Sequence, residues 1–486
     1  MGQTKTTSYL ETEKIGTLMR KYSIPCIISM VVGALYNIVD QIFIANADYL
    51  GSYGNAANTV VYPITVLALG IAVMIGDGGA AYVGACLGRK DMDTARRSIG
   101  NAILLNVICG FVLMCLYLIF NDSIIALCGG TVNAETYSLA KEYFFWISLG
   151  IPFYIFGQGM NPLIRSDGSP KFAMAATVLG AVTNIVLDPI MIYGLFGCPK
   201  MGMMGAAIAT VAGQILTAAL SVWYLCHMKV IRLDWKCFGL WGSLMRKFLT
   251  LGVTSFLTQI ALVISMATVN NMCTKYGALD AIFSQEEYSQ IPLAVLGIVM
   301  KFFGIAISIG TGIAAGSIPV VSYNIGAKRN DRAKQLFTYL IATELGVGIV
   351  ALLIVEVFPQ TLIGIFGAAN ESQHYTQFAV RCFRIYLCTM PLCMMNKGVF
   401  IYLQAIGKPV ASISITMARE ILFGVALPIL LPLIWGLDGV LYSFPAADFL
   451  ATCISIAVII NTYRELNDKM EKRSQRNLEF PATTVN

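Results

Sequence analysis

The chain has 486 residues, of which 57% are hydrophobic and only 12% are charged, and its mean hydropathy is +0.71. A soluble domain carries charge on about a quarter of its residues, so this composition excludes an ordinary soluble protein and indicates a surface that faces lipid. The net charge of +6 does not indicate nucleic-acid binding, because the basic residues are spread over short loops. No Walker motif, Cys/His cluster or nucleophile–base arrangement is present, so we expect neither an enzyme nor a cofactor.

Twelve apolar segments follow one another along the chain, and each is long enough to cross a bilayer core of about 30 Å as a helix. The first 21 residues are polar and lack the apolar core of a removable signal peptide, so we expect the first apolar helix to remain in the membrane. The predicted helices lie at 22–45, 58–87, 99–120, 141–161, 171–196, 204–226, 249–273, 292–320, 335–357, 377–402, 409–433 and 437–462. The sequence therefore predicts an all-α membrane protein with twelve transmembrane helices.

Basic residues concentrate in alternate loops of this predicted topology. Segments 89–97 and 328–334 carry four basic residues each, whereas the opposite loops hold few besides Lys200 and Lys275. Basic loops stay on the cytoplasmic side of a membrane. We therefore expect a multi-pass protein of the bacterial cytoplasmic membrane with both termini in the cytoplasm.

The sequence resembles itself at a separation of about half its length. The matching segments are 18–21 with 244–247, 88–96 with 326–334, and 168–170 with 407–409. Six spans in each half place both halves the same way up, and such parallel repeats are related by an axis along the membrane normal. We expect two six-helix lobes with pseudo-two-fold symmetry, with the substrate path between them.

The repeat and the loops divide the chain into four parts. The N-lobe spans 1–228, a cytoplasmic connector spans 229–248, the C-lobe spans 249–463, and a cytoplasmic tail spans 464–486. The tail is charged and lacks apolar periodicity, which is typical of a disordered segment.

The two halves differ in polar residues inside their spans. A charged side chain within a span costs about 2.5–3.5 kcal/mol on insertion scales and is normally retained for function. Only the N-terminal half bears this cost at the aligned positions. Asp40, Asn184 and Asp188 of the first half align with Met266, Phe423 and Leu427 of the second.

The two acids of this set are expected to meet in one place. Asn184 and Asp188 share a helix face, and Tyr36, Asn37 and Asp40 share a face of the first helix. The helical rise places Asp40 about 27 Å and Asp188 about 25 Å from the cytoplasmic starts of their helices. Two buried acids at one depth require a proton or a bound cation, and oxygen ligands suit a hard cation such as Na⁺. The alternative is that each acid is a helix-end residue hydrated from outside.

Five stretches together resemble the multidrug and toxic compound extrusion (MATE) family, and most closely its MepA-like bacterial branch. They are LYNIVD at 35–40, NIVLDP at 184–189, GAAIAT at 205–210, YNIGAKR at 323–329 and WGLDGV at 435–440. The resemblance implies two six-helix lobes around a V-shaped chamber and antiport of drug-like, often cationic compounds against Na⁺ or H⁺. It also implies that Asp40, Asn184, Asp188 and Thr210 bind the coupling cation.

A second pattern known in that family, with acids in the seventh and tenth helices, is not met. The seventh helix offers Gln259, and the tenth offers Arg381, Arg384 and Lys397 but no acid. The resemblance therefore makes cation coupling in the C-lobe doubtful.

Further polar and methionine residues inside the spans have two interpretations each. Tyr36, Asn37 and Asp77 are accessory candidates for the cation site, although Asp77 also suits a partner for a nearby cation. Candidates for lining the substrate chamber are Gln259, Met266, Lys301 and Met390, where Met also suits plain packing. Arg419 and Glu420 suit a salt bridge or a substrate contact, and Asp448 suits a cap or an ion pair.

Three classes of function remain open on the sequence. The first is a cation-coupled antiporter that exports a small molecule and works as a monomer in the bilayer. The second is a flippase for a lipid-linked oligosaccharide, which would need a cationic cavity built from Lys301, Arg381, Arg384, Lys397 and Arg419. The third is a non-transporting receptor, which the absence of large extramembrane domains and the intramembrane acids disfavour.

Overall fold

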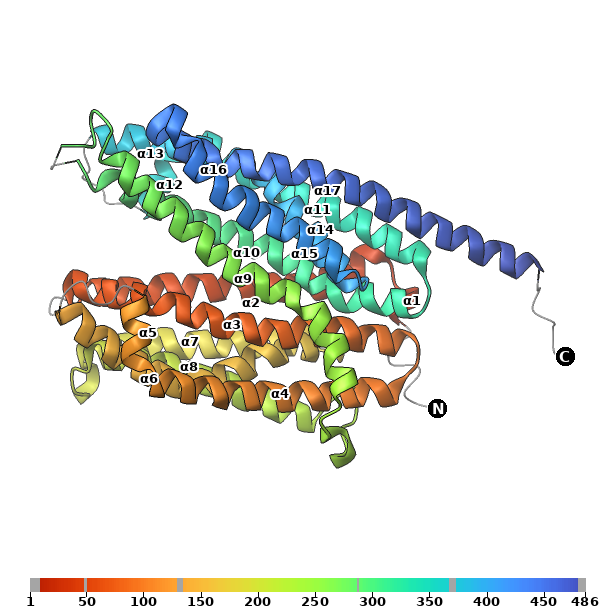
Figure 1. The fold of residues 1–486 in the computed structure, drawn as a ribbon. Coiled ribbons are helices and arrows are strands. Elements are labelled where there is room, and N and C mark those ends of the chain that lie inside the picture. The colour runs from red at the N-terminus through yellow and green to blue at the C-terminus, as the bar shows by residue number, and fades with distance from the viewer. Residues whose placement is uncertain (1–8, 48–49, 129–133, 286–287, 367–372, 480–486) are drawn as a thin grey trace.

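The computed structural model describes residues 9–47, 50–128, 134–285, 288–366 and 373–479, and every regular element in them is a helix. The N-lobe contains α1 (Tyr9–Thr12), α2 (Ile15–Ala45), α3 (Gly51–Gly88), α4 (Met92–Ile119), α5 (Asn121–Leu127), α6 (Ala134–Ser166), α7 (Pro170–Tyr193), η2 (Leu195–Gly197) and α8 (Gly202–Cys226). The connector holds η3 (Trp235–Phe238). The C-lobe contains α9 (Gly242–Gly277), α10 (Ile291–Gly326), α11 (Asn330–Val357), α12 (Pro359–Phe366), α13 (Gln373–Tyr386), α14 (Met390–Ala405), α15 (Pro409–Met417), η4 (Ala418–Phe423), α16 (Gly424–Leu430) and α17 (Pro432–Glu479). Figure 1 shows the helices in two bundles, one for each half of the chain.

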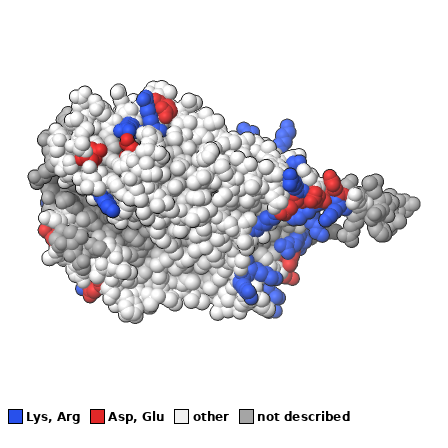
Figure 2. Space-filling model, turned by 45° about the horizontal axis from the view of Figure 1, so that its top comes forward, with Lys and Arg blue, Asp and Glu red and all other residues white. Residues whose placement is uncertain are grey.

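The expected membrane architecture is confirmed. Within the described ranges, ten helices are long and apolar enough to cross a membrane, and an eleventh span forms if α13 and α14, bent by 42°, count together. The 33-residue α6 packs along α3, α4 and α8 as the sixth long helix of the N-lobe. In the C-lobe, the bent pair of α13 and α14 takes the place of the sixth. Charged side chains gather at the ends of the molecule and leave a wide uncharged band between them, as a lipid-facing belt requires (Figure 2).

The internal repeat is present in the backbone as well as in the sequence. Lys90 and Lys328 occupy the same position in the two halves, and each adopts a left-handed conformation, with φ of 64° and 57°. Gly168 and Gly407 also correspond, and both have φ of 83°. A residue in this conformation ends a helix because it turns the next N–H groups back onto the last carbonyls. The matching loops therefore stop equivalent helices with the same turn.

The lobes touch along only part of their length. A Cβ added to Gly312 or Gly316 of α10 would lie 2.6 Å from Ile27 or 2.8 Å from Ser23 of α2, so these two helices are in backbone contact there. A Cβ added to Gly304 of α10 would meet no atom within 4 Å. The two helices run antiparallel, and the contacting residues lie in the second half of α10 and the first half of α2. This backbone contact therefore lies in the half of the membrane nearer the termini. The two bundles accordingly meet at that end and diverge toward the other (Figure 1).

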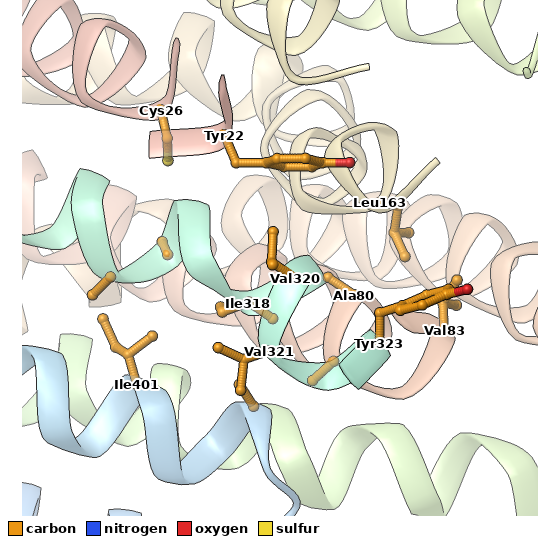
Figure 3. Close-up of a cluster of buried hydrophobic side chains, with 14 of the residues drawn as sticks. Tyr22, Cys26, Ala80, Val83, Leu163, Ile318, Val320, Val321, Tyr323 and Ile401 are labelled. Carbon is orange, nitrogen blue, oxygen red and sulfur yellow. The ribbon is translucent and has the colours of Figure 1, made fainter. Parts of the chain in front are cut away.

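Apolar side chains from both lobes fill this region of contact. Tyr22 of α2 and Val83 of α3 belong to the same buried cluster as Val320 of α10 and Ile401 of α14. Figure 3 shows these side chains pointing toward one another from the different helices. The hydrophobic core is therefore continuous across the lobes at the end that carries the termini.

The connector is anchored to the N-lobe by one buried carboxylate. Asp167, in the loop between α6 and α7, accepts the hydroxyl of Tyr224 at 2.8 Å and the backbone N–H groups of Lys229, Val230 and Ile231 at 2.7 to 3.1 Å. Burial raises the pKa of Asp167, although these hydrogen bonds favour its ionised form. The next long helix, α9, begins at Gly242, seven residues before the predicted start at 249.

The expectation of a disordered tail from residue 464 is wrong as far as Glu479. Helix α17 continues to that residue because its inner face finds partners. Leu466 is 2% exposed, Lys334 donates to Asn467 at 2.9 Å, and Lys408 pairs with Glu465. The remaining residues of the predicted tail, 480–486, lie outside the described part of the chain.

Candidate functional site

Helices α2, α7 and α8 bring the four predicted cation-site residues together inside the N-lobe. Helix α7 begins with Pro170 in its first turn and ends at Gly194 with φ of 71°, a start and a stop typical of helices. Between them, Asn184 and Asp188 face the same way. The Nδ2 group of Asn184 donates to Oδ1 of Asp188 at 3.1 Å and to Oγ1 of Thr210 on α8 at 3.2 Å.

The second carboxylate of the site comes from α2. Asp40 is 6% exposed and Asp188 is fully buried, and the two groups are close enough to interact electrostatically. Asp40 Oδ1, Asn184 Oδ1 and Asp188 Oδ2 are all buried, and none has a hydrogen-bond partner among the described residues. Three unpartnered acceptor oxygens in one buried place are costly unless a donor or a cation joins them. This set of carboxylate, amide and hydroxyl oxygens suits a proton or a hard cation such as Na⁺.

Two tyrosines complete the surroundings of the carboxylates. Tyr36, an accessory candidate, lies near Asp40 and Asp188, and so does Tyr143 of α6, which the sequence analysis did not identify. Asn37 is exposed and donates to the carbonyl of Gly33 in its own helix at 2.8 Å, and it joins the group only through a hydrogen bond with Tyr36. No feature of the sequence distinguishes Tyr143 from other tyrosines, since only packing brings α6 against the site.

A small cavity adjoins this group inside the N-lobe. Its volume is about 40 Å³, which suits a water molecule or a small ion and not an organic substrate. It is lined by Tyr36, Gln158, Asn184, Thr210, Gln214 and Thr217 among others. These polar side chains extend from the carboxylates into the lobe, beside apolar groups such as Phe153 and Ala181 that make up the rest of the lining.

Asp77 lies in a different place, at the contact between the lobes. Its Oδ2 accepts the hydroxyl of Ser255 on α9 at 2.9 Å, and Ser255 also accepts from Nε2 of Gln404 on α14 at 3.1 Å. Arg165 of α6 approaches its Oδ1 at 4.0 Å and also donates to Cys26. Asp77 is therefore a partner for a nearby cation and for the opposite lobe, in agreement with the second of its two interpretations.

The chamber candidates do not share one environment. Gln259 and Met266 of α9 and Lys301 of α10 are half-buried, and Gln259 faces Gly70 of α3 across the lobes. Met390 differs from the expectation of a chamber position, because it is fully buried in a hydrophobic cluster of the C-lobe.

The C-lobe contains its own buried charges, so intramembrane polarity is not confined to the N-lobe. Arg419 donates to Asp448 at 2.9 Å and to Glu420 at 2.7 Å, and Glu420 also pairs with Lys397 at 3.4 Å. Arg419 and Glu420 lie in η4, a π-helical interruption, and such interruptions are frequent at functional sites. Both suit the salt-bridge interpretation, and Asp448 is an ion-pair partner. A further buried acid, Glu344, lies within the apolar run of α11 and was not among the residues predicted from the sequence.

The comparisons with known proteins agree with this architecture. The MatE family model matches residues 25–190 and 255–430. Multidrug export protein MepA of Staphylococcus aureus (strain MSSA476) is 22% identical over 457 residues, covering 93% of this chain and 95% of that protein. An FAD transporter of Shewanella oneidensis is 23% identical over 446 residues, covering 90% and 92%.

A solved structure of the MATE multidrug transporter DinF-BH matches with a TM-score of 0.82 at 29% identity, covering 93% of this chain and 96% of that one. The match thus extends over both lobes. Members of this family are transporters and not enzymes. Because the family model matches well over half of the residues, in both halves of the repeat, this multi-pass membrane protein belongs to the MatE family.

Proposed function

We propose that this chain exports drug-like, cationic organic compounds across the cytoplasmic membrane by antiport against Na⁺ or H⁺. Membership of the MatE family supports transport, and the names of MepA and DinF-BH support drug-like substrates. The predicted loop charges support an orientation with both termini in the cytoplasm. In that orientation the lobes are packed together on the cytoplasmic side and diverge toward the outside.

The observation that carries the proposal is the group of three unpartnered oxygens of Asp40, Asn184 and Asp188. A proton or a sodium ion bound there offsets one of the two negative charges and lowers the repulsion between the carboxylates. A cation can drive export only if it and the substrate bias one conformational equilibrium in opposite senses. Binding of the cation to the N-lobe would favour one arrangement of α2 and α7, and release of substrate would follow from the change in lobe packing.

Dye transport into inside-out vesicles under separate Na⁺ and pH gradients tests the proposal. We expect Asp40→Asn and Asp188→Asn each to lower gradient-driven transport more than about tenfold, which corresponds to a barrier higher by about 1.4 kcal/mol or more. The matched control is Asp93→Asn, since the Asp93 side chain on α4 is 85% exposed. Full gradient-driven transport in either site variant would contradict the assignment. Including FAD beside the cationic dyes tests whether an anionic dinucleotide is a substrate instead.

The flippase alternative loses its main support in the structure. Of the five basic residues that would form a cationic cavity, four are paired with acids. Arg381 pairs with Asp438, Arg384 with Glu356, Lys397 with Glu420, and Arg419 with Asp448 and Glu420. Pairing removes the excess positive charge that a diphosphate needs, so we retain the drug antiporter as the proposed function.

A further inference from the structure

One buried acid of the C-lobe, Glu344, lacks a hydrogen-bond partner among the residues that the structure describes. Glu344 is the fifteenth residue of the 28-residue α11 and is fully buried. Neither of its carboxyl oxygens has a hydrogen-bond partner among the described residues. Every other buried acid of this lobe belongs to the network around Arg419, as far as the described residues go.

Glycines of two neighbouring helices make room for this side chain. A Cβ added to Gly310 of α10 would lie 2.9 Å from Oε2 of Glu344, and one added to Gly398 of α14 would lie 3.0 Å from its Cγ. The carboxyl group is therefore held where α10, α11 and α14 pack together (Figure 1). A pocket shaped by two glycines around one carboxyl group is a built site, and removing the carboxyl would leave a void.

The surroundings of Glu344 contain no compensating charge. Lys397, beside Gly398 on α14, pairs with Glu420. Lys301 lies nine residues before Gly310 on α10, and Glu356 is near the far end of α11, where it pairs with Arg384. Among the described residues, no basic group forms an ion pair with Glu344, and neither of its carboxyl oxygens accepts a hydrogen bond.

The atoms around the Glu344 carboxyl group indicate whether a proton or a metal cation suits the site. A hard cation such as Na⁺ or Ca²⁺ is held by several oxygen ligands. The other side chains beside these two glycines, Leu340 and Met394, offer carbon and sulfur rather than oxygen. An ionised carboxylate with neither partner nor cation is too costly to bury. A proton is the one ligand that satisfies the site.

We propose that Glu344 is a proton-binding site of the C-lobe, separate from the Asp40–Asp188 group, and that it holds its proton when α10, α11 and α14 are packed as they are here. Loss of the proton would require water to enter between these helices. The C-lobe thereby gains a packing arrangement that depends on protonation, which goes beyond the proposed function of the N-lobe site.

Infrared spectroscopy of the full-length protein in lipid nanodiscs tests this site. Selective ¹³C labelling of glutamate separates its protonated-carboxyl band from those of Asp40 and Asp188. At neutral pH we expect one such band in the wild-type protein, its loss in Glu344→Gln, and its retention in the matched control Glu356→Gln on the same helix. Asp40→Asn and Asp188→Asn should leave it unchanged, so the two proposals fail independently.

A second variant keeps the test decisive if Glu344→Gln does not fold. In Gly398→Ala the added methyl group would press on Cγ of Glu344, so the band should shift in frequency. Absence of any protonated-glutamate band at neutral pH overturns the proposal. The proposal is also overturned if the Glu344→Gln protein keeps the wild-type band. If only Gly398→Ala folds, a band at the wild-type frequency in that variant overturns the proposal.

Discussion

At the scale of single residues, the two lobes differ in whether their buried acids have basic partners. In the C-lobe, Arg419 and Lys397 balance Asp448 and Glu420 through direct ion pairs. In the N-lobe, Asp40 and Asp188 have no basic partner within the described ion pairs. A balanced network is a structural unit, whereas an unbalanced pair of acids needs an exchangeable cation. The difference explains why we place cation binding in the N-lobe.

The balanced network predicts a large loss of stability when one acid is neutralised. Asp448→Asn leaves Arg419, which is 9% exposed in its side chain, with less compensation. We expect the free energy of unfolding to fall by about 3–5 kcal/mol, as when one partner of a buried ion pair is removed. The free energy of unfolding is measured by equilibrium unfolding of both proteins in mixed detergent micelles.

Asp438→Asn is the control, because it breaks the pair with Arg381, whose side chain is 52% exposed. An exposed pair contributes at most about 1 kcal/mol. Equal losses in the two variants would show that Asp448 does not stabilise Arg419.

At the scale of helices, glycines set where the lobes touch. Gly78 of α3 and Gly252 of α9 bring two backbones into contact between the lobes, and a Cβ added to Gly252 would lie 1.8 Å from the carbonyl oxygen of Met74. Small residues serve this purpose in membranes, where close van der Waals packing drives helix association. Gly78 and Gly84 of α3 and Gly312 and Gly316 of α10 are therefore interface residues.

Enlarging one such glycine should weaken the contact between lobes. We expect Gly252→Ala to destabilise the protein by about 1–3 kcal/mol, the usual cost of overpacking, and to lower dye transport. Thermal unfolding in detergent, followed by the transport assay, measures both effects. Gly242→Ala on the same helix is the control, because nothing lies within 4 Å of its added Cβ. A Gly252→Ala protein as stable and as active as this control would refute the close contact.

At the scale of the whole molecule, the lobes meet at one end and diverge at the other, and the proposed antiport needs a second conformation with the opposite arrangement. The lobes are joined at the end that carries the termini by an apolar cluster and by the hydrogen bond from Ser255 to Asp77. Both interactions must break before the other end can close. They therefore stabilise the observed conformation relative to the alternative one.

Removing the hydrogen bond from Ser255 to Asp77, one of several between the lobes, should shift this equilibrium. A hydrogen bond to a charged group contributes about 1.5–3 kcal/mol, so Ser255→Ala should raise the population of the alternative conformation about tenfold or more. Cys26, which is 1% exposed and lies at the contact between the lobes, is a native reporter. Its rate of alkylation by a maleimide, measured by mass spectrometry, should rise.

The control for this measurement is Ser308→Ala, since Ser308 donates to Gly304 within its own helix. An unchanged rate at Cys26 in Ser255→Ala would mean that the bond to Asp77 does not hold the lobes together.

The sequence by itself determined the helical membrane architecture, the repeat and the group of N-lobe residues that we propose as the cation site. These follow from local signals: apolar runs long enough to span a bilayer, matched turns at Lys90 and Lys328, and acids placed at one depth by the helical rise. Even so, the helix ends were set by contacts outside the apolar core, and the prediction of a disordered tail did not anticipate the partners of α17.

Only the tertiary structure decided which polar residues are partnered. Asp77, Glu344 and Asp448 are all acids within apolar segments, and their spacing along the chain does not distinguish them. Asp77 accepts a hydrogen bond from the opposite lobe, and Asp448 forms an ion pair with Arg419. Glu344 has no hydrogen-bond partner among the described residues. The physical reason is that the cost of a buried charge depends on atoms a few ångströms away, and those atoms come from helices distant in the sequence.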